Sequence, residues 1–496
     1  MPGGTPSEVA IIGGGFGGIA AAVKLQRAGI NDFTVFEQSP APGGTWWDNR
    51  YPGCEVDIPS HAYSFSFMPY DWPRTHATQP ELQEYAEAVV DRFGLRSRFR
   101  FGVKIRSVAW DENAALYVVT TGDGEQHRFR FVISAVGLLN VPRYPSWPGL
   151  DEFGGVSFHT ARWDAGVELT GKRVAIVGTG STAVQIVPAI APDVERLEVF
   201  QREPGWVEPK GERAFTPAER ARFRRLPAVR RLYRLKLFHT SMRRFKAYDA
   251  KGREQRRMRE LCLRYIETAI HDPAVRAAVT PSYPWGCKRP IYASGFYPAL
   301  NRPNVDLVPH AVTKVTEKGV VDDQGVEHPV DVLILSTGFQ PTRFLSGFTV
   351  TGRRGVEIQE FWGDRPRAFL GVTVPGFPNF FIMYGPNTNG GFSIIAQLER
   401  QAEIAVSAIR RARRAGAAQV DTRERTLDRY VRWVDRQLAG HASAMDAGCN
   451  NYYHSPSGAN VTQWPRTHFV YYLLCRTLPT FGLVYQGRRT APGRTS

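Results

Sequence analysis

The chain is 496 residues long, and its length, composition and charge already exclude several classes of protein. Hydrophobic residues make up 43% and charged residues 22%, a balance typical of folded domains rather than of disordered chains. This length predicts two or three domains. No apolar run reaches the roughly 18 residues of a membrane-spanning helix, and the glycine-rich N-terminal run lacks the basic flank of a signal peptide. We therefore expect a cytoplasmic enzyme.

Cysteine usage gives the same indication. The five cysteines are scattered, and none belongs to a Cys-x-x-Cys pair. They are Cys54, Cys262, Cys287, Cys449 and Cys475. We expect reduced thiols, with no metal site, no disulfide framework and no dithiol redox centre.

Most of the net charge of +16 lies between residues 210 and 260, which hold 18 basic and 5 acidic residues. Apolar residues recur among the arginines at the spacing of an amphipathic helix. Nucleic acid or an anionic membrane could bind such a face. We favour a solvated helical face that packs on its own protein, because no zinc finger or single-strand-binding aromatic pattern accompanies it. We expect no nucleic-acid partner, and a weak contact of residues 210–260 with anionic membranes stays open.

Two parts of the chain repeat one plan: an apolar run, a glycine loop, a helix and a second apolar run. In the first part the loop spans residues 13–18 and the second run spans 33–37. In the second part these are residues 178–183 and 197–202. This alternation predicts an α/β fold with two Rossmann-type dinucleotide-binding domains and the basic stretch as a helical insertion in the second.

The end of the second run predicts which dinucleotide each loop binds. Gly13 and Glu37 are 24 positions apart, and so are Gly178 and Arg202. Glu37 can accept hydrogen bonds from the ribose hydroxyls of FAD, whereas Arg202 suits the 2′-phosphate of NADPH. If the runs are aligned on Val-Phe, Gln201 replaces the acid, and the assignment stays the same.

Each dinucleotide domain is expected to be discontinuous. The predicted divisions are 1–142 and 365–496 for the FAD domain (the latter with a lid and C-terminal segment), 143–206 and 286–364 for the NADP domain, and 207–285 for the insertion.

Two longer motifs carry a family resemblance. Phe153-Gly-Gly155-Val-Ser-Phe-His159-Thr-Ala-Arg-Trp163-Asp164 matches the pattern FxGxxxHxxxW(P/D), and residues 43–57 match GGxWxxxxYPGxxxD. The sequence resembles the class B flavoprotein monooxygenases and, more narrowly, the type I Baeyer–Villiger monooxygenases. His159 lies between the two nucleotide units, and we favour an interdomain hydrogen-bonding role for it over direct catalysis.

The resemblance implies oxidation of a ketone to an ester or lactone by one atom of O2, through a C4a-peroxyflavin formed on FAD that NADPH has reduced. It implies that Arg289 lies over the flavin and stabilises this anion, and that Asp57 orients Arg289. Lys288 would hold the 2′-phosphate together with Arg202.

The loops and the resemblance together give the candidate site residues. For FAD they are Gly13, Gly15, Phe16, Gly18, Glu37, Gly44, Thr45, Trp46, Asp57 and Tyr63. For NADP they are Glu55, Val56, Gly178, Thr179, Gly180, Ser181, Thr182, Ala183, Gln185, Arg202, Lys288, Arg289 and Tyr452. The interdomain motif adds Phe153, Gly155, His159, Trp163 and Asp164.

Two alternatives and one departure qualify this interpretation. A flavin monooxygenase of sulfides or amines is disfavoured by the terminal Trp163-Asp164, and a basic nucleotide-binding protein without oxygenase activity is a distant third. Tyr452 stands where the resembled family commonly has a tryptophan, which affects the expected lid contact with NADP.

Overall fold

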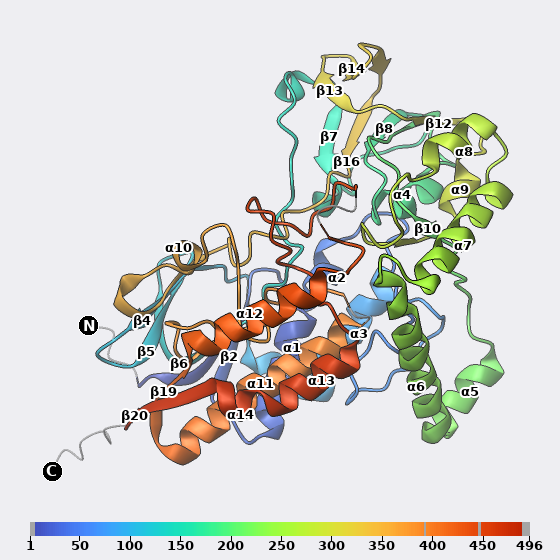
Figure 1. Cartoon of the computed structure of the whole chain (residues 1–496). Coiled ribbons are helices and arrows are strands. Elements are labelled where there is room, and N and C mark those ends of the chain that lie inside the picture. The colour runs from blue at the N-terminus through green and yellow to red at the C-terminus, as the bar shows by residue number, and fades with distance from the viewer. Residues whose placement is uncertain (1–4, 391–392, 445–447, 489–496) are drawn as a thin grey trace.

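The computed structural model describes residues 5–390, 393–444 and 448–488, and these form two lobes (Figure 1). Each lobe is built on a sheet with a parallel core and helices on its faces. The predicted α/β fold with two Rossmann-type units is confirmed. Within the described ranges, no helix has the length and apolar character needed to cross a membrane.

The sheet of the first lobe has the strand order β17-β4-β5-β6-β1-β2-β3, and β18 also pairs with β6. Its strands are β1 (Ser7–Ile12), β2 (Phe33–Glu37), β3 (Phe99–Phe101), β4 (Ile105–Asp111), β5 (Leu116–Thr121), β6 (Gln126–Ser134), β17 (Thr349–Thr351) and β18 (Phe380–Ile382). β1 lies between parallel neighbours, with Ile12 opposite both Phe36 and Ser134. Its apolar run is buried on both faces: Val9 and Ile11 pack on the core shared with α1 and α11, and Ala10 and Ile12 pack on the core shared with β4 and β5.

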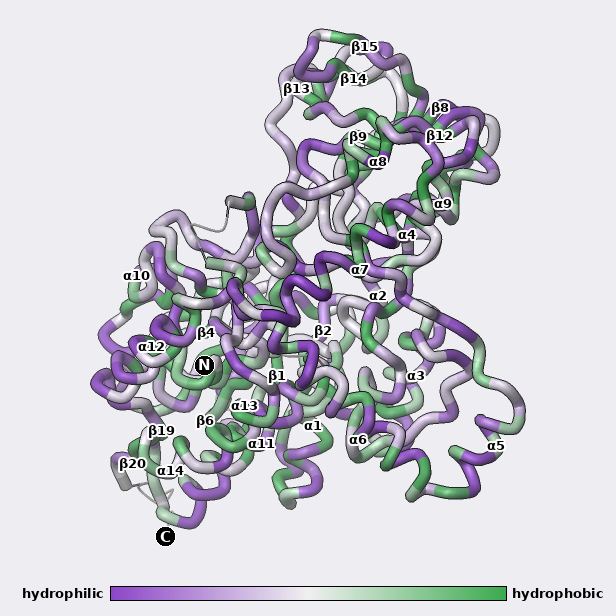
Figure 2. Tube along the Cα trace, turned by 45° about the vertical axis from the view of Figure 1, so that its right-hand side comes forward, coloured by the Kyte–Doolittle hydropathy of each residue, from purple (hydrophilic) through white to green (hydrophobic). Residues whose placement is uncertain are grey.

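The helices of the first lobe come from distant parts of the chain. They are α1 (Phe16–Arg27), α2 (Thr45–Asp48), α3 (Gln79–Arg92), α10 (Ile358–Trp362), α11 (Ile394–Ala415), α12 (Glu424–Leu438), α13 (His468–Thr477) and α14 (Pro479–Gly482). α1 and α11 share one apolar core, and Figure 2 shows hydrophobic residues along both. The antiparallel strands β19 (Ala417–Thr422) and β20 (Leu483–Arg488) pair at the edge of this lobe.

The second lobe holds a parallel sheet of order β12-β9-β8-β16-β7. Its elements are β7 (Val156–His159), β8 (Arg173–Val177), α4 (Ala183–Ile190), β9 (Arg196–Phe200), α9 (Phe296–Ala299), β12 (Val305–Val308) and β16 (Val332–Leu335). Above it in Figure 1 lies the antiparallel group β13 (Val312–Val315), β14 (Gly319–Asp322) and β15 (Glu327–Pro329).

The chain crosses between the lobes twice, and the two crossings lie side by side. The amide of Arg143 donates to the carbonyl of Gly338 at 2.9 Å, and the amide of Gln340 donates to that of Val141 at 3.0 Å. β17 already pairs with β4 of the first sheet, so the chain re-enters that sheet before residue 365, where the sequence placed the division. Sequence reasoning missed this because a three-residue strand has no readable period.

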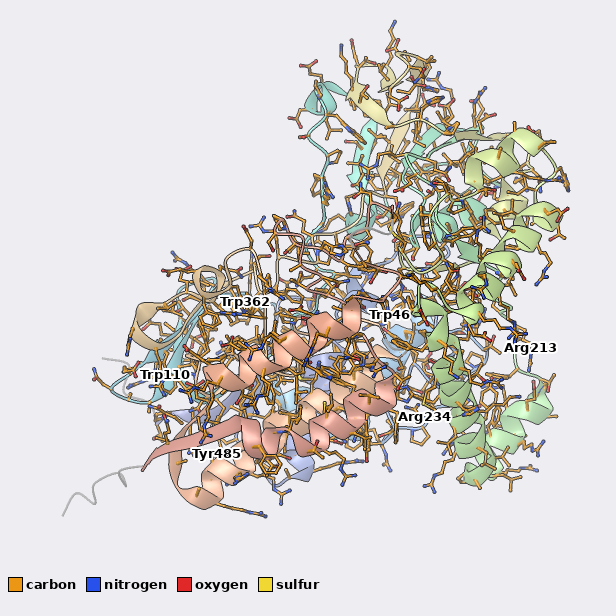
Figure 3. All side chains as sticks on the ribbon, in the orientation of Figure 1. Trp46, Trp110, Arg213, Arg234, Trp362 and Tyr485 are labelled. Carbon is orange, nitrogen blue, oxygen red and sulfur yellow. A yellow bond between two sulfur atoms is a disulfide. The ribbon has the colours of Figure 1, made fainter. Side chains whose placement is uncertain are left out.

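The basic stretch forms helices, as predicted. The insertion contains β10 (Val207–Glu208), α5 (Pro217–Arg225), α6 (Pro227–Arg244), α7 (Arg253–Ala269) and α8 (Pro273–Val279), and β11 (Ile291–Tyr292) pairs with β10 beyond it. α6 descends from the second lobe along the side of the first (Figure 1). Arg234, labelled in Figure 3, donates from Nη1 to the carbonyl of Ser64 at 3.0 Å, so α6 braces one lobe against the other.

The cysteine prediction is wrong in one respect. Cys287 and Cys449 form a disulfide, whereas Cys54, Cys262 and Cys475 are buried free thiols. The two partners are 162 positions apart, and the C-terminal segment folds back onto the segment before Arg289. Spacing along the sequence carries no information on such a pairing.

Candidate active site

The first glycine loop has the geometry of a dinucleotide site. Gly13 has φ +102°, and its amide donates to the carbonyl of Phe36 at 2.8 Å. A Cβ on Gly18 would lie 1.9 Å from the carbonyl oxygen of Gly13, so only glycine fits where α1 passes the loop. A Cβ on Gly15 would lie 3.4 Å from the Cα of Gly44, and the next residue, Phe16, is buried. The glycines thus let the chain turn tightly into the N-terminus of α1, the kind of helix end at which a pyrophosphate binds.

Glu37 ends β2 beside this loop and is buried. Its carboxylate accepts hydrogen bonds from the amide of Gly14 at 2.5 Å and from the amide of Ser39 at 2.8 Å. Burial raises the pKa of Glu37, and these two amides counteract the rise. The carboxylate is therefore fixed at the position from which it can accept hydrogen bonds from ribose hydroxyls.

The second glycine loop repeats this geometry. Gly178 has φ +111° and donates to the carbonyl of Phe200 at 2.9 Å, and a Cβ there would lie 2.5 Å from the carbonyl oxygen of Ser336. A Cβ on Gly180 would meet no atom within 4 Å, so the loop faces open space there. Thr179, Ser181 and Thr182 continue the loop to Ala183, the buried first residue of α4. These residues fit a pyrophosphate lying on the helix N-terminus.

The residues after β9 decide which side chain faces this loop. Gln201 is buried, and its Nε2 donates to the carbonyl of Ala278 at 2.8 Å. Arg202 is exposed, and its charge acts on Lys288, which forms an ion pair with Glu203. Burial and the nearby Arg202 lower the pKa of Lys288 despite Glu203. Arg202 and Lys288 thus lie near one another just beyond β9, with Glu203 paired to Lys288.

Asp57 and Arg289 form an ion pair at the junction of the lobes. Arg289 Nη2 lies 2.6 Å from Asp57 Oδ2. Burial of Asp57 works to raise its pKa, but the guanidinium, assisted by Lys210, outweighs it and lowers the pKa below its usual range. The carboxylate in turn raises the pKa of Arg289 far above its usual range. Both groups therefore stay charged near neutral pH.

Aromatic side chains stand beside this pair. Trp46, between the lobes in Figure 3, donates from Nε1 to the hydroxyl of Tyr63 at 3.2 Å. The rings of Trp46 and Tyr63 meet edge to face at 5.7 Å, and Phe16 lies 5.9 Å from Tyr63. Thr45 begins α2 on the exposed side of this group. The arrangement gives the first glycine loop a wall for a flat ring system.

A network behind Asp57 ties the first lobe to α4. Tyr51 donates from its hydroxyl to Gln185 Oε1 at 3.1 Å, and Gln185 Nε2 donates to the carbonyl of Glu55 at 3.0 Å. The amide of the buried Val56 donates to the carbonyl of Ala77 at 3.0 Å. The predicted Glu55, Val56 and Gln185 are thus brought to the junction, where they fix the loop that carries Asp57.

The C-terminal segment closes the other side of the centre. Tyr452 is 39% exposed, and its ring meets that of Tyr453 at 4.7 Å. Its hydroxyl is close enough to Arg289 to contribute to the raised pKa of that guanidinium. Asn451 donates from Nδ2 to the carbonyl of Cys287 at 3.2 Å. Tyr452 therefore occupies a place where it faces the Arg289 centre.

The interdomain motif lies along β7, and His159 reaches the crossings. Its Nδ1 accepts from the amide of Ala161 at 3.0 Å, and its Nε2 lies 3.0 Å from the carbonyl oxygen of Gly338. Burial lowers the pKa of His159, so the neutral ring donates from Nε2 to Gly338. The interdomain role favoured from the sequence fits this geometry.

Three of the other four motif residues support β7 itself, and the fourth, Asp164, holds the turn that follows. A Cβ on Gly155 would lie 2.3 Å from the carbonyl oxygen of Asp331, Phe153 packs on the core beneath the sheet, and Trp163 meets Phe158 edge to face at 5.0 Å. Exposed Asp164 accepts from the amide of Gly166 at 2.9 Å.

Comparison with known proteins identifies the family. The family described as pyridine nucleotide-disulphide oxidoreductase matches residues 10–242, which include both glycine loops. A Baeyer–Villiger monooxygenase of Streptomyces coelicolor is 41% identical over 463 residues, which cover 93% of this chain and 89% of that protein. The chain belongs to the Baeyer–Villiger monooxygenases. One from Pseudomonas aeruginosa is 36% identical, over 98% of this chain and 94% of that protein.

Solved structures agree with this placement. A cyclohexanone monooxygenase in an open form matches with a TM-score of 0.86 and 30% identity, covering 98% of this chain and all of that one. An oxidised steroid monooxygenase bound to NADP matches with a TM-score of 0.87 and 28% identity, covering 97% and 100%.

In this Baeyer–Villiger monooxygenase, the centre also depends on residues that sequence reasoning missed. Lys210 Nζ lies 2.6 Å from Glu55 Oε1, and its side chain is 1% exposed. Tyr384, which has φ +61°, donates from its hydroxyl to Asn389 Oδ1 at 2.7 Å near Arg289. The positive φ is invisible in the sequence, and the charge of Lys210 was read as part of a solvated face.

Glu208 is the other missed residue. It is buried on β10, pairs with Arg244 of α6 and accepts from Trp285 Nε1 at 3.2 Å. Burial raises its pKa, while Arg244 and Trp285 work against the rise. Trp285 opens the segment that leads to Arg289, so Glu208 joins α6 to that segment.

Proposed function

We propose that this protein inserts one oxygen atom of O2 into a ketone at the expense of NADPH, giving an ester or lactone. The observation that carries the proposal is the Asp57–Arg289 ion pair of 2.6 Å at the junction of the two lobes, each of which holds a dinucleotide-type glycine loop. Asp57 comes from the first lobe, and Arg289 lies beyond the insertion in the second. Each lobe thus contributes one side of the charged centre.

FAD fits the first loop and NADPH the second. The close contact of Gly18 with Gly13 and the fixed carboxylate of Glu37 support the first assignment. The open Gly180 and the exposed Arg202 beside Lys288 support the second. Bound FAD and NADPH supply hydride transfer and the activation of O2.

The protein supplies position, charge and exclusion of water. Arg289 stays protonated, so it stabilises negative charge that develops above the flavin site and on the ketone oxygen. Asp57 stays ionised and holds the guanidinium in place. Trp46, Tyr63 and Tyr452 line the centre and limit the access of water to it.

The test is NADPH consumption under air by the purified holoenzyme, against a panel of ketones, with hydrogen peroxide measured in parallel. Ketone-dependent NADPH oxidation with ester product and little peroxide is expected. Arg289→Ala should abolish ester formation, whereas Arg343→Ala, which removes an exposed arginine from a crossing between the lobes, should retain it. Full ester formation by Arg289→Ala would contradict the proposal.

For the partners, we infer a weak contact of α6 with anionic membranes, from which an apolar ketone could be collected. α6 has no acidic residue, and Leu232 and Leu235 are 65% and 63% exposed beside Arg231 and Lys236. At low salt the protein should sediment with phosphatidylglycerol vesicles, and it should stay in the supernatant with neutral vesicles. No sedimentation with either vesicle would contradict the contact. The cytoplasmic location stays a prediction.

A further inference from the structure

The Cys287–Cys449 disulfide joins two segments that face the active centre. Cys287 is two residues before Arg289, and Cys449 is three residues before Tyr452. The side chain of Asn451 bridges the same two residues: its Nδ2 donates to the carbonyl of Cys287 at 3.2 Å and lies 3.6 Å from Cys449 Sγ. The bond is therefore a covalent clamp between the segment that carries Arg289 and the segment that carries Tyr452.

The pair differs from the other cysteines in its chemistry. Burial raises the pKa of Cys54 and of Cys475 to about 12, and it raises that of Cys262 as well, so these thiols stay protonated and unreactive. Cys287 is 1% exposed, whereas Cys449 is half-buried. Of the two partners, Cys449 lies nearer the solvent, so an external thiolate would attack the disulfide on that side.

We propose that Cys287 and Cys449 form a reversible thiol–disulfide site whose reactants are dithiols and hydroperoxides, and whose state sets the affinity for NADP+. The inference rests on the proposed function in one respect: NADP+ must bind beside Arg289 and Tyr452. The disulfide form holds the Tyr452 segment on the Arg289 segment, and the dithiol form loses this covalent link while the hydrogen bond from Asn451 to Cys287 remains.

Both directions of the reaction balance. In reduction, a thiolate of the dithiol attacks Cys449 Sγ, the S–S bond breaks, and Cys287 leaves as a thiolate that takes up a proton. The second thiol of the reductant then displaces Cys449, so one disulfide is exchanged for another. In oxidation, the Cys449 thiolate attacks a hydroperoxide ROOH and breaks its O–O bond, which gives a sulfenic acid and an alkoxide that takes up a proton and leaves as ROH. The Cys287 thiol then displaces water from the sulfenic acid and restores the disulfide.

The clamp acts on cofactor affinity through pre-organisation. With the bond closed, the backbone on both sides of the centre is held before NADP+ arrives, so binding orders fewer groups. With the bond open, binding must first bring the Tyr452 segment into place, which lowers apparent affinity by the fraction of molecules in that state. We expect the Kd for NADP+ to rise about tenfold on reduction, as for a competent fraction of roughly one tenth.

The test begins by counting thiols in the FAD-loaded full chain, unfolded after treatment with a peroxide or a dithiol. Three titratable thiols are expected after peroxide and five after dithiol, with a Cys287–Cys449 cross-linked peptide in the first sample alone. The Kd for NADP+ is then measured by quenching of protein fluorescence in both states. Cys475→Ser should keep the tenfold difference in Kd between the two treatments. Cys449→Ser should show the Kd of the reduced wild type after either treatment, because it cannot form the disulfide.

The outcomes separate this inference from the proposed function. Five titratable thiols after peroxide would overturn the pairing of Cys287 with Cys449. Equal Kd values for NADP+ in the oxidised and reduced wild type would overturn the effect of the disulfide on cofactor affinity. No variant is needed for either result, so misfolding of Cys449→Ser leaves the test intact. Absence of NADP+ binding in both states would overturn the proposed function, and the control of affinity with it.

Discussion

Replacement of Lys210 by methionine tests how the loop carrying Asp57 is held. Lys210 Nζ lies 2.6 Å from Glu55 Oε1, and the two side chains are 1% and 24% exposed. Breaking a buried ion pair by removing one partner costs about 3–5 kcal/mol, because the other charge is left uncompensated. Glu55 keeps partial contact with water, so we expect Lys210→Met to lower the free energy of unfolding by about 2–3 kcal/mol.

The function should change as well as the stability. The charge of Lys210 contributes to the low pKa of Asp57, so its loss raises that pKa. The acid limb of the kcat/KM profile should then move to higher pH, which a purely structural role would not produce.

Urea unfolding of Lys210→Met, Glu55→Gln and the double variant measures the coupling between the two residues. We expect a coupling of about 1–3 kcal/mol, with the double variant less damaged than the sum of the single ones. Lys236→Met, at an exposed position of α6, is the matched control and should leave both stability and the profile unchanged. Additive losses in the double variant would refute the reasoning.

Three further predictions concern the loops and the buried histidines. Gly18→Ala should prevent tight FAD binding, because its Cβ would lie 1.9 Å from a backbone oxygen. Gly17→Ala is the control, since its Cβ would make only ordinary contacts from 3.4 Å. Equal flavin content in the two purified variants would contradict this prediction. Arg202→Gln should lower kcat/KM for NADPH by about tenfold and leave kcat/KM for NADH constant, as expected for the loss of one charged hydrogen bond to a phosphate. The control Arg196→Gln should change neither value. An equal loss with both cofactors would exclude a phosphate contact of Arg202. Burial lowers the pKa of His61 to about 4, so between pH 6.5 and 4 the unfolded chain takes up a proton that the folded protein does not. The free energy of unfolding should therefore fall by up to ~1.4 kcal/mol per pH unit over this range. Urea unfolding at pH 5 and 7 should show a smaller difference between the two pH values for His61→Phe than for the wild type.

Local sequence features predicted the parts of the site that are built within one segment. The glycine loops follow strands, Glu37 ends β2 and Arg202 lies two residues beyond β9, so spacing alone places them at the carboxyl end of a parallel sheet. The structure resolved what alignment left open, since Gln201 turns inward to Ala278 and Arg202 faces outward. Strand alternation fixes which of two adjacent residues is buried, but only once the register is known.

The parts that span long separations were out of reach. Asp57 and Arg289 are 232 positions apart, and only the family resemblance paired them. Nothing comparable marked Lys210, Glu208 or the disulfide. These contacts form because α6 and the C-terminal segment return to the centre, and no period of 2 or 3.6 residues records such a return.

The insertion shows why net charge alone was ambiguous. Some of its arginines turn back onto the protein and pair with its acidic side chains: Arg220 and Arg224 both pair with Asp71 at 2.8 Å, and Arg244 pairs with the buried Glu208. These pairs join α5, α6 and β10 to both lobes, and β10 lies in register with β11, two residues beyond Arg289. The inward charges therefore help set the position of Arg289 relative to Asp57, while the outward ones are left to solvent or a surface. Composition counts both groups alike, and only the direction of each side chain separates a brace from a binding face.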